Sequence, residues 1–72
     1  MAKARINGLY AVTPDLTDTG RLAALVRAAL EGGCRWVQYR NKAAPAALRR
    51  EQALELRRLT AQWGARLMIN DD

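Results

Sequence analysis

The chain has 72 residues, half of them apolar, and a formal net charge of +5. This composition excludes a disordered chain, and no apolar run approaches the roughly 18 residues that a membrane span needs. A single cysteine excludes an intramolecular disulfide, and the lack of histidine excludes a His-based metal site or a His-assisted nucleophile built from these residues alone.

The charge pattern and the N-terminus bear on location and partners. The arginines are spread along two predicted helices and no aromatic platform accompanies them, so we expect no nucleic-acid partner. The first residues are followed by no apolar block of signal-peptide length, which predicts a cytoplasmic protein with no membrane partner. Cys34 lies within an apolar run, and we interpret it as a small buried side chain.

The first strand and the first helix are predicted from the patterns over residues 8–31. Residues 8–13 form a short apolar run, which Pro14 and Asp15 end with turn chemistry. Asp18 or Thr19 can cap a helix start. Helical spacing then predicts one buried face, made of Leu22, Leu25, Val26, Ala29 and Leu30, before two glycines stop the helix.

The second half of the chain repeats this order. Residues 34–39 are rich in aromatic and β-branched types and predict a strand. A helix is predicted over residues 45–63, because Pro45 suits a first turn and one stripe collects Leu48, Gln52, Leu56, Leu59 and Trp63. Leu54 lies off that stripe. Residues 66–69 then predict a third strand, followed by Asn70, Asp71 and Asp72.

The resulting order, β-α-β-α-β, predicts an α/β fold with parallel strands and right-handed crossovers. A natural domain rarely stops at the tip of a strand, so we expect residues 1–72 to be a truncated part of one domain. The carboxyl ends of parallel strands lie on one edge of a sheet, where ligands bind in α/β barrels and open sheets.

Polar side chains collect at that edge. Gln38, Arg40 and Lys42 alternate at the end of the second strand, so they are expected to point to one side. Arginine and lysine suit phosphate, and the amide can donate or accept. The alternative to phosphate binding is that these side chains are simply solvated at the end of the strand.

An acidic cluster follows the third strand at the same edge. Asp71 is a candidate Mg²⁺ ligand, because this ion prefers oxygen ligands and often joins carboxylates to substrate phosphates. We assign Asp72 to a helix cap or to the outer coordination shell of the metal. For both Asp71 and Asp72 the alternative is that the side chain only caps the next helix. Tyr10 can present its ring to a flat ligand or belong to the core.

Three segments in this order and spacing resemble thiamine phosphate synthase: residues 8–13 (GLYAVT), 37–42 (VQYRNK) and 68–72 (MINDD). The resemblance implies a (β/α)₈ barrel, of which this chain would supply the first three strands and two helices. It also implies a transferase of thiamine biosynthesis that joins a pyrimidine pyrophosphate to a thiazole phosphate, with release of pyrophosphate.

The resemblance also implies site residues. Arg40 and Lys42 would be catalytic, and Asp71 would bind Mg²⁺. The residues that bind the substrate would be Gln38, Tyr39, Arg40, Asn41, Lys42 and Asn70. Among them, the side chains of Tyr39 and Asn41 would point away from the ligand, because side chains alternate along a strand. We expect no activity from the 72 residues alone. A thiazole tautomerase-like paralogue and a non-catalytic basic fragment are the alternatives, and the oligomeric state stays open.

Overall fold

The computed structural model describes residues 5–6 and 10–70 of the chain. In these residues the chain forms the following elements: β1 (Arg5–Ile6), β2 (Tyr10–Val12), α1 (Thr19–Glu31), β3 (Trp36–Tyr39), α2 (Ala46–Gln62) and β4 (Arg66–Ile69). The α/β class and the β-α-β-α-β order of the parallel part are confirmed. Within the described ranges, neither helix has the length and apolar character needed to cross a membrane.

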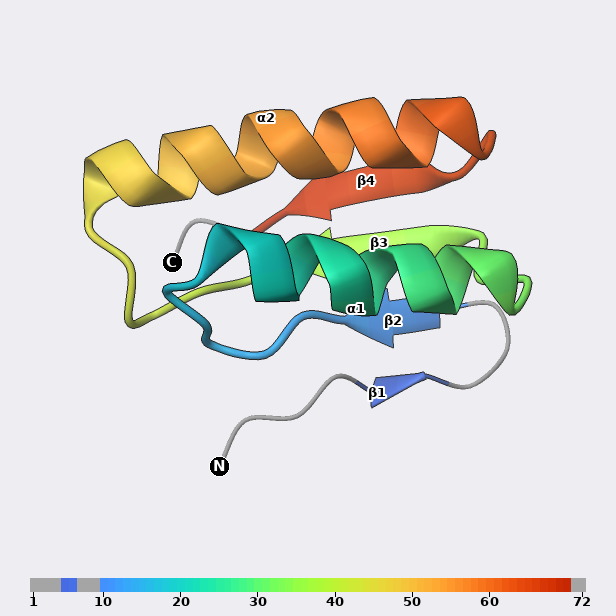
Figure 1. Ribbon diagram of the computed structural model, residues 1–72, viewed down its shortest axis with the longest axis horizontal. Helices are drawn as coiled ribbons and strands as arrows, with labels where there is room; N and C mark the ends of the chain where they lie inside the picture. The colour runs from blue at the N-terminus through green and yellow to red at the C-terminus, as the bar shows by residue number, and fades with distance from the viewer. Residues whose placement is uncertain (1–4, 7–9, 71–72) are drawn as a thin grey trace.

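The strands form one sheet in the order β1-β2-β3-β4 (Figure 1). β2, β3 and β4 run parallel, with Val37 of β3 beside Ala11 and Leu67 on its two neighbours. β1 pairs with β2 in the antiparallel direction, which the sequence did not predict because two residues carry no readable periodicity. The predicted strand over residues 8–13 is shorter in the structure, and its residues 8 and 9 lie outside the described part.

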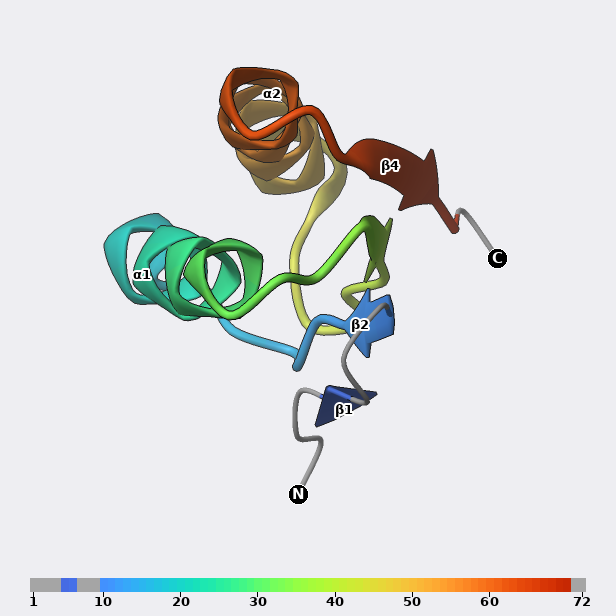
Figure 2. The ribbon, with the colours of Figure 1, turned by 90° about the vertical axis from the view of Figure 1, so that its right-hand side faces the viewer.

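Both helices cover the same face of the sheet (Figure 2). Between them and the strands lies the core, in which the buried side chains are Ala11, Leu22, Val26, Ala29, Leu30, Cys34, Val37, Tyr39, Leu56 and Leu59. The prediction that Cys34 is a small buried side chain is confirmed. No described element covers the other face of the sheet, on which Trp36 and Gln38 of β3 lie.

Local signals explain where the helices begin and end. The Asp18 carboxylate accepts a hydrogen bond from the Arg21 backbone N–H at 3.1 Å, so Asp18 is the N-cap of the two predicted candidates, and Thr19 is the first residue of the helix. Gly33 and Gly64, which follow the two helices, have φ of 100° and 69°. Only glycine adopts this backbone conformation freely, so each glycine fixes the turn that leads into the next strand.

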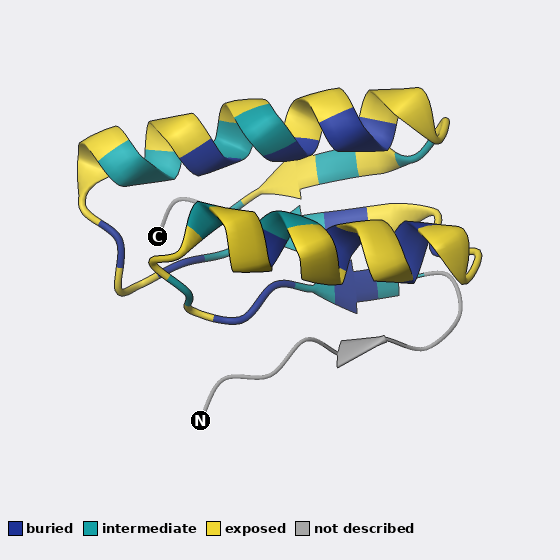
Figure 3. Ribbon diagram, in the orientation of Figure 1, coloured by how far each residue is buried: buried dark blue, intermediate teal, exposed yellow. Residues whose placement is uncertain are grey.

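Each helix carries both buried and exposed residues along its length (Figure 3). Two predicted core residues are nevertheless exposed. Leu25 is 44% exposed, because it lies at the rim of the α1 stripe rather than at its centre. Trp63 is also 44% exposed, because α2 ends at Gln62 and Trp63 lies past the part of the helix that faces the sheet. Leu54 is exposed, as its position off the stripe predicted.

Candidate functional site at the carboxyl ends of the strands

The carboxyl ends of the three parallel strands lie side by side, as the sequence predicted. The Thr13 backbone N–H donates to the Gln38 carbonyl at 3.0 Å, and the Asn70 N–H donates to the Tyr39 carbonyl at 2.9 Å. These bonds join the ends of β2 and β4 to the end of β3. In Figure 1 the loops that follow β2 and β3 leave the sheet at this same edge. We call Gln38, Arg40, Lys42 and Asn70 the strand-end cluster.

Arg40 is held by its backbone while its side chain is left partly unsatisfied. The Thr13 hydroxyl donates to the Arg40 carbonyl at 3.2 Å and accepts from the Arg40 N–H at 3.0 Å. The Arg40 Nε atom is buried and has no hydrogen-bond partner in the described part of the chain. A buried donor without a partner is costly, so this atom is suited to an anionic ligand.

Gln38 lies on the uncovered face of the sheet. Its Oε1 atom accepts a hydrogen bond from the Tyr10 hydroxyl, which comes from the neighbouring strand. Its Nε2 group is of the type that donates hydrogen bonds. Tyr10 is half-buried, and this bond restrains the orientation of the Gln38 amide.

Lys42 is exposed, and its backbone is fixed. Its N–H donates to the Asp15 carboxylate at 3.1 Å, so the loop after β2 and the loop after β3 are joined a second time. β3 ends at Tyr39, yet the alternation of burial continues to Lys42: Val37, Tyr39 and Asn41 are buried, whereas Gln38, Arg40 and Lys42 are not. Burial therefore alternates over residues 37–42 with the period that the prediction requires.

Tyr39 and Asn41 belong to the opposite, buried side, being 2% and 3% exposed. The Tyr39 hydroxyl donates to Gln52 Oε1 at 2.5 Å, and Asn41 Nδ2 donates to the same oxygen at 2.9 Å. Burial raises the pKa of the Tyr39 hydroxyl, against a smaller lowering by Asn41, so the phenol stays a neutral donor. A substrate-binding role for Tyr39 and Asn41 stays a prediction, and their side chains are occupied by these contacts.

The acidic part of the site is described only up to Asn70, which is half-buried at the end of β4. Asp71 and Asp72 lie outside the described residues, so their predicted metal and capping roles stay predictions. Residues 5–6 and 10–70 contain no cluster of three or more His, Cys, Asp or Glu side chains that could hold a metal ion.

Two contributors were not assigned a role from the sequence. Gln52 was placed on the apolar stripe of the second helix, and a polar residue at a core position is the signal that could have identified it. Thr13 lies in a turn-like run, and its contact with Arg40, 27 positions away, left no local signal.

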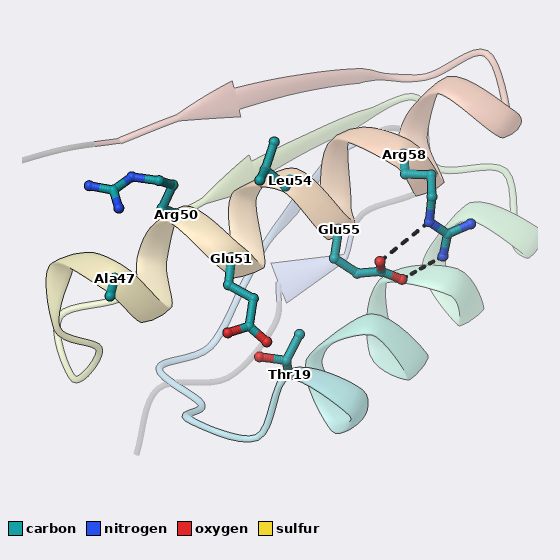
Figure 4. Close-up of a pocket in the computed structure, with 7 residues that line it drawn as sticks. All are labelled: Thr19, Ala47, Arg50, Glu51, Leu54, Glu55 and Arg58. Atoms are coloured by element: carbon teal, nitrogen blue, oxygen red, sulfur yellow. Dashed lines mark hydrogen bonds and ion pairs between the residues drawn. The ribbon is translucent and has the colours of Figure 1, made fainter.

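A groove of about 520 Å³ is lined by residues of α2 and by Thr19, the first residue of α1 (Figure 4). In it the Glu55 carboxylate accepts two hydrogen bonds from Arg58, at 3.3 and 2.5 Å. These bonds lower the pKa of Glu55. The pair is exposed, and such pairs contribute little to stability. The groove contains no member of the strand-end cluster.

Comparison with known proteins assigns the chain to a family. The model of the family described as thiamine monophosphate synthase matches residues 9–72. The thiamine-phosphate synthase of Chromobacterium violaceum is 54% identical over 94% of this chain and 33% of its own length. The thiamine-phosphate synthase of Nitrosomonas eutropha is 45% identical over 99% of this chain and 34% of its own length. That of Xylella fastidiosa is 55% identical over 90% of this chain and 27% of its own length.

The chain thus spans about a third of the length of the curated relatives it matches. No solved structure gives a significant match. The family match covers both helices and the three parallel strands, including every residue of the strand-end cluster. The chain belongs to the thiamine monophosphate synthase family.

Proposed function

We propose that the whole protein of which these residues form part is a transferase that joins a pyrimidine pyrophosphate to a thiazole phosphate and releases pyrophosphate. Small molecules would be its partners, and the strand-end cluster would hold the pyrophosphate group. Names of the relatives support a role in thiamine biosynthesis. The observation that carries the proposal is the buried, unpartnered Nε of Arg40 at the meeting point of three strand ends.

The cluster offers donors of the kind that a diphosphate requires. Arg40 can form a bidentate, charge-assisted pair with phosphate oxygens, and Lys42 supplies an exposed point charge two residues away. Gln38 keeps an amide donor on the uncovered face of the sheet. Thr13 bonds both backbone groups of Arg40, so the backbone that carries the guanidinium is already ordered. Less conformational entropy is therefore lost when the pyrophosphate group binds.

In the proposed reaction the bond between the pyrimidine methylene carbon and the diphosphate oxygen breaks, and its electron pair leaves with pyrophosphate. The thiazole nitrogen then forms the new carbon–nitrogen bond with its lone pair. Arg40 and Lys42 would stabilise the negative charge that develops on the leaving group. Asp71, directly after Asn70, would contribute one ligand to Mg²⁺, which neutralises diphosphate charge when bound.

The test is made in a grafted synthase, in which residues 9–72 replace the matching third of the Chromobacterium violaceum relative. Coupling of the two substrates is measured with Mg²⁺ present. We expect Arg40→Met to raise the KM for the pyrimidine pyrophosphate and to lower kcat, by about 100-fold in kcat/KM, which corresponds to about 2.7 kcal/mol of lost charge-assisted bonding. Lys42→Met should act in the same direction but less strongly.

The matched control is Arg57→Met, because Arg57 is an exposed arginine of α2 outside the cluster. It should leave both kinetic constants within twofold of the parent. Equal effects of Arg40→Met and Arg57→Met, or no effect of either, would show that the strand-end cluster does not bind the pyrophosphate group.

A further inference from the structure

Gln52 is a polar side chain in the middle of the core. It lies on α2, is fully buried, and shares its stripe with the buried leucines Leu56 and Leu59. A buried amide is destabilising unless its hydrogen bonds are made. Here Gln52 Oε1 accepts from the Tyr39 hydroxyl at 2.5 Å and from Asn41 Nδ2 at 2.9 Å, and Nε2 donates to the Leu16 carbonyl at 3.0 Å.

Asn41 extends this set of bonds to the neighbouring loops. Its Nδ2 group also donates to the Leu16 carbonyl at 2.7 Å, and its Oδ1 atom accepts from the Ala43 N–H at 3.0 Å. Gln52 therefore contacts the end of β3, the loop after β3 and the loop after β2 at the same time. Because donors and acceptors are matched, the amide has one preferred orientation.

The residues that Gln52 holds alternate with the residues of the strand-end cluster. Tyr39 lies between Gln38 and Arg40 in the chain, and Asn41 lies between Arg40 and Lys42. In extended backbone, fixing every second side chain on one side directs the intervening ones to the other side. β3 ends at Tyr39, so the sheet no longer enforces this alternation beyond that point.

We infer that Gln52 is a positioning residue, which keeps Arg40 and Lys42 on the ligand side of the chain after β3 has ended. It does so through Tyr39 and Asn41 and touches neither substrate. The inference rests on the proposed function, because it assumes that Arg40 and Lys42 bind the pyrophosphate group. Supporting groups of this kind hold binding side chains near their productive geometry.

The test uses Gln52→Met in the grafted synthase, because methionine preserves the length of the side chain and removes its hydrogen bonds. Gln62→Met is the matched control, since Gln62 is an exposed glutamine at the end of the same helix. We expect Gln52→Met to raise the KM for the pyrimidine pyrophosphate about tenfold, with the KM for the thiazole phosphate within twofold of the parent. Gln62→Met should change neither.

Amide hydrogen exchange gives a readout that needs no substrate. The N–H groups of Lys42 and Ala43 are bonded in the loop after β3, so in Gln52→Met they should exchange at least tenfold faster. The Val37 N–H, in the middle of β3, should be unaffected. Should Gln52→Met not fold, Tyr39→Phe removes only one of the three bonds and should give smaller changes of the same kind.

The outcomes separate this inference from the proposed function. Unchanged exchange at Lys42 and Ala43 overturns the inference, whatever Arg40→Met does to KM. Faster exchange with an unchanged KM also overturns the positioning role, and so does an equal rise of KM for both substrates. If Arg40→Met leaves the pyrimidine pyrophosphate KM unaltered, the proposed function fails on its own test.

Discussion

The Thr13 hydroxyl is the contact whose removal should report most directly on the strand-end geometry. Thr13 is 5% exposed, and its hydroxyl bonds both backbone groups of Arg40. Valine has the same shape but no hydroxyl, so Thr13→Val leaves the Arg40 N–H and carbonyl without this partner. At about 1 kcal/mol for each bond, we expect a loss of about 2 kcal/mol in the free energy of unfolding.

A second buried threonine provides the control for this substitution. Thr60 is 3% exposed, and its hydroxyl donates to the Arg57 carbonyl one turn earlier in α2, at 3.2 Å. This is a local helical bond, whereas Thr13 joins positions 27 apart in the chain. Thr60→Val should therefore cost no more than about 1 kcal/mol, the net value of one such bond.

Urea unfolding of the grafted synthase and of the two variants measures these values. Thr13→Val should also raise the KM for the pyrimidine pyrophosphate, because Arg40 loses its fixed starting point. Thr60→Val should not. Equal losses of stability in the two variants, together with an unchanged KM, would show that the Thr13 contact neither stabilises the strand end nor orients Arg40.

Three further outcomes follow from burial, capping and ionisation. Leu59→Ala removes a fully buried side chain and should cost about 3 kcal/mol of unfolding free energy, whereas Leu54→Ala, at an exposed position of the same helix, should cost under about 0.5 kcal/mol; similar losses would contradict the described core. Asp18→Ala removes the cap bond to Arg21 and should cost about 1 kcal/mol, while Asp18→Ser should keep most of it, both read from urea midpoints. Burial raises the pKa of Tyr39 above 10.0, so as the pH rises the unfolded chain loses the phenol proton before the folded chain does. The contribution of Tyr39 to the free energy of unfolding is therefore complete below about pH 10 and declines as the pH rises toward the raised pKa of the folded state. Tyr39→Phe should remove this decline, and parallel curves for parent and variant between about pH 9 and pH 11 would refute the assignment.

The parallel part of the fold was predictable because its signals are local. Helical spacing around Leu22 and Leu56, the Asp18 cap and the glycines after each helix together fixed the element order. The antiparallel β1 was missed, because its two residues pair with β2 through backbone groups that no side-chain pattern reports. Exposure at Leu25 and Trp63 depends on which elements pack beside them, so helical spacing alone could not predict it.

The candidate site was predictable in its composition but not in its support. Parallel strands bring their carboxyl ends together, so the predicted order of elements is enough to place Gln38, Arg40 and Asn70 at one edge of the sheet. The contacts of Thr13 and Gln52 with residues 11 to 36 positions away depend on how the loops fold back. No spacing rule relates such positions, and only the three-dimensional structure shows them.

The two glycine turns also determine which side chains of the following strand face the helices and which face the open side of the sheet. In each turn one backbone N–H returns to a carbonyl five residues earlier, from Cys34 to Ala29 and from Ala65 to Thr60, at 3.0 and 2.9 Å. Inserting or deleting one residue between such a turn and its strand would exchange the two sides of that strand. Val37 would then meet the open side and Gln38 the helices, so single-residue length changes in these short turns should be tolerated far less than in most surface loops.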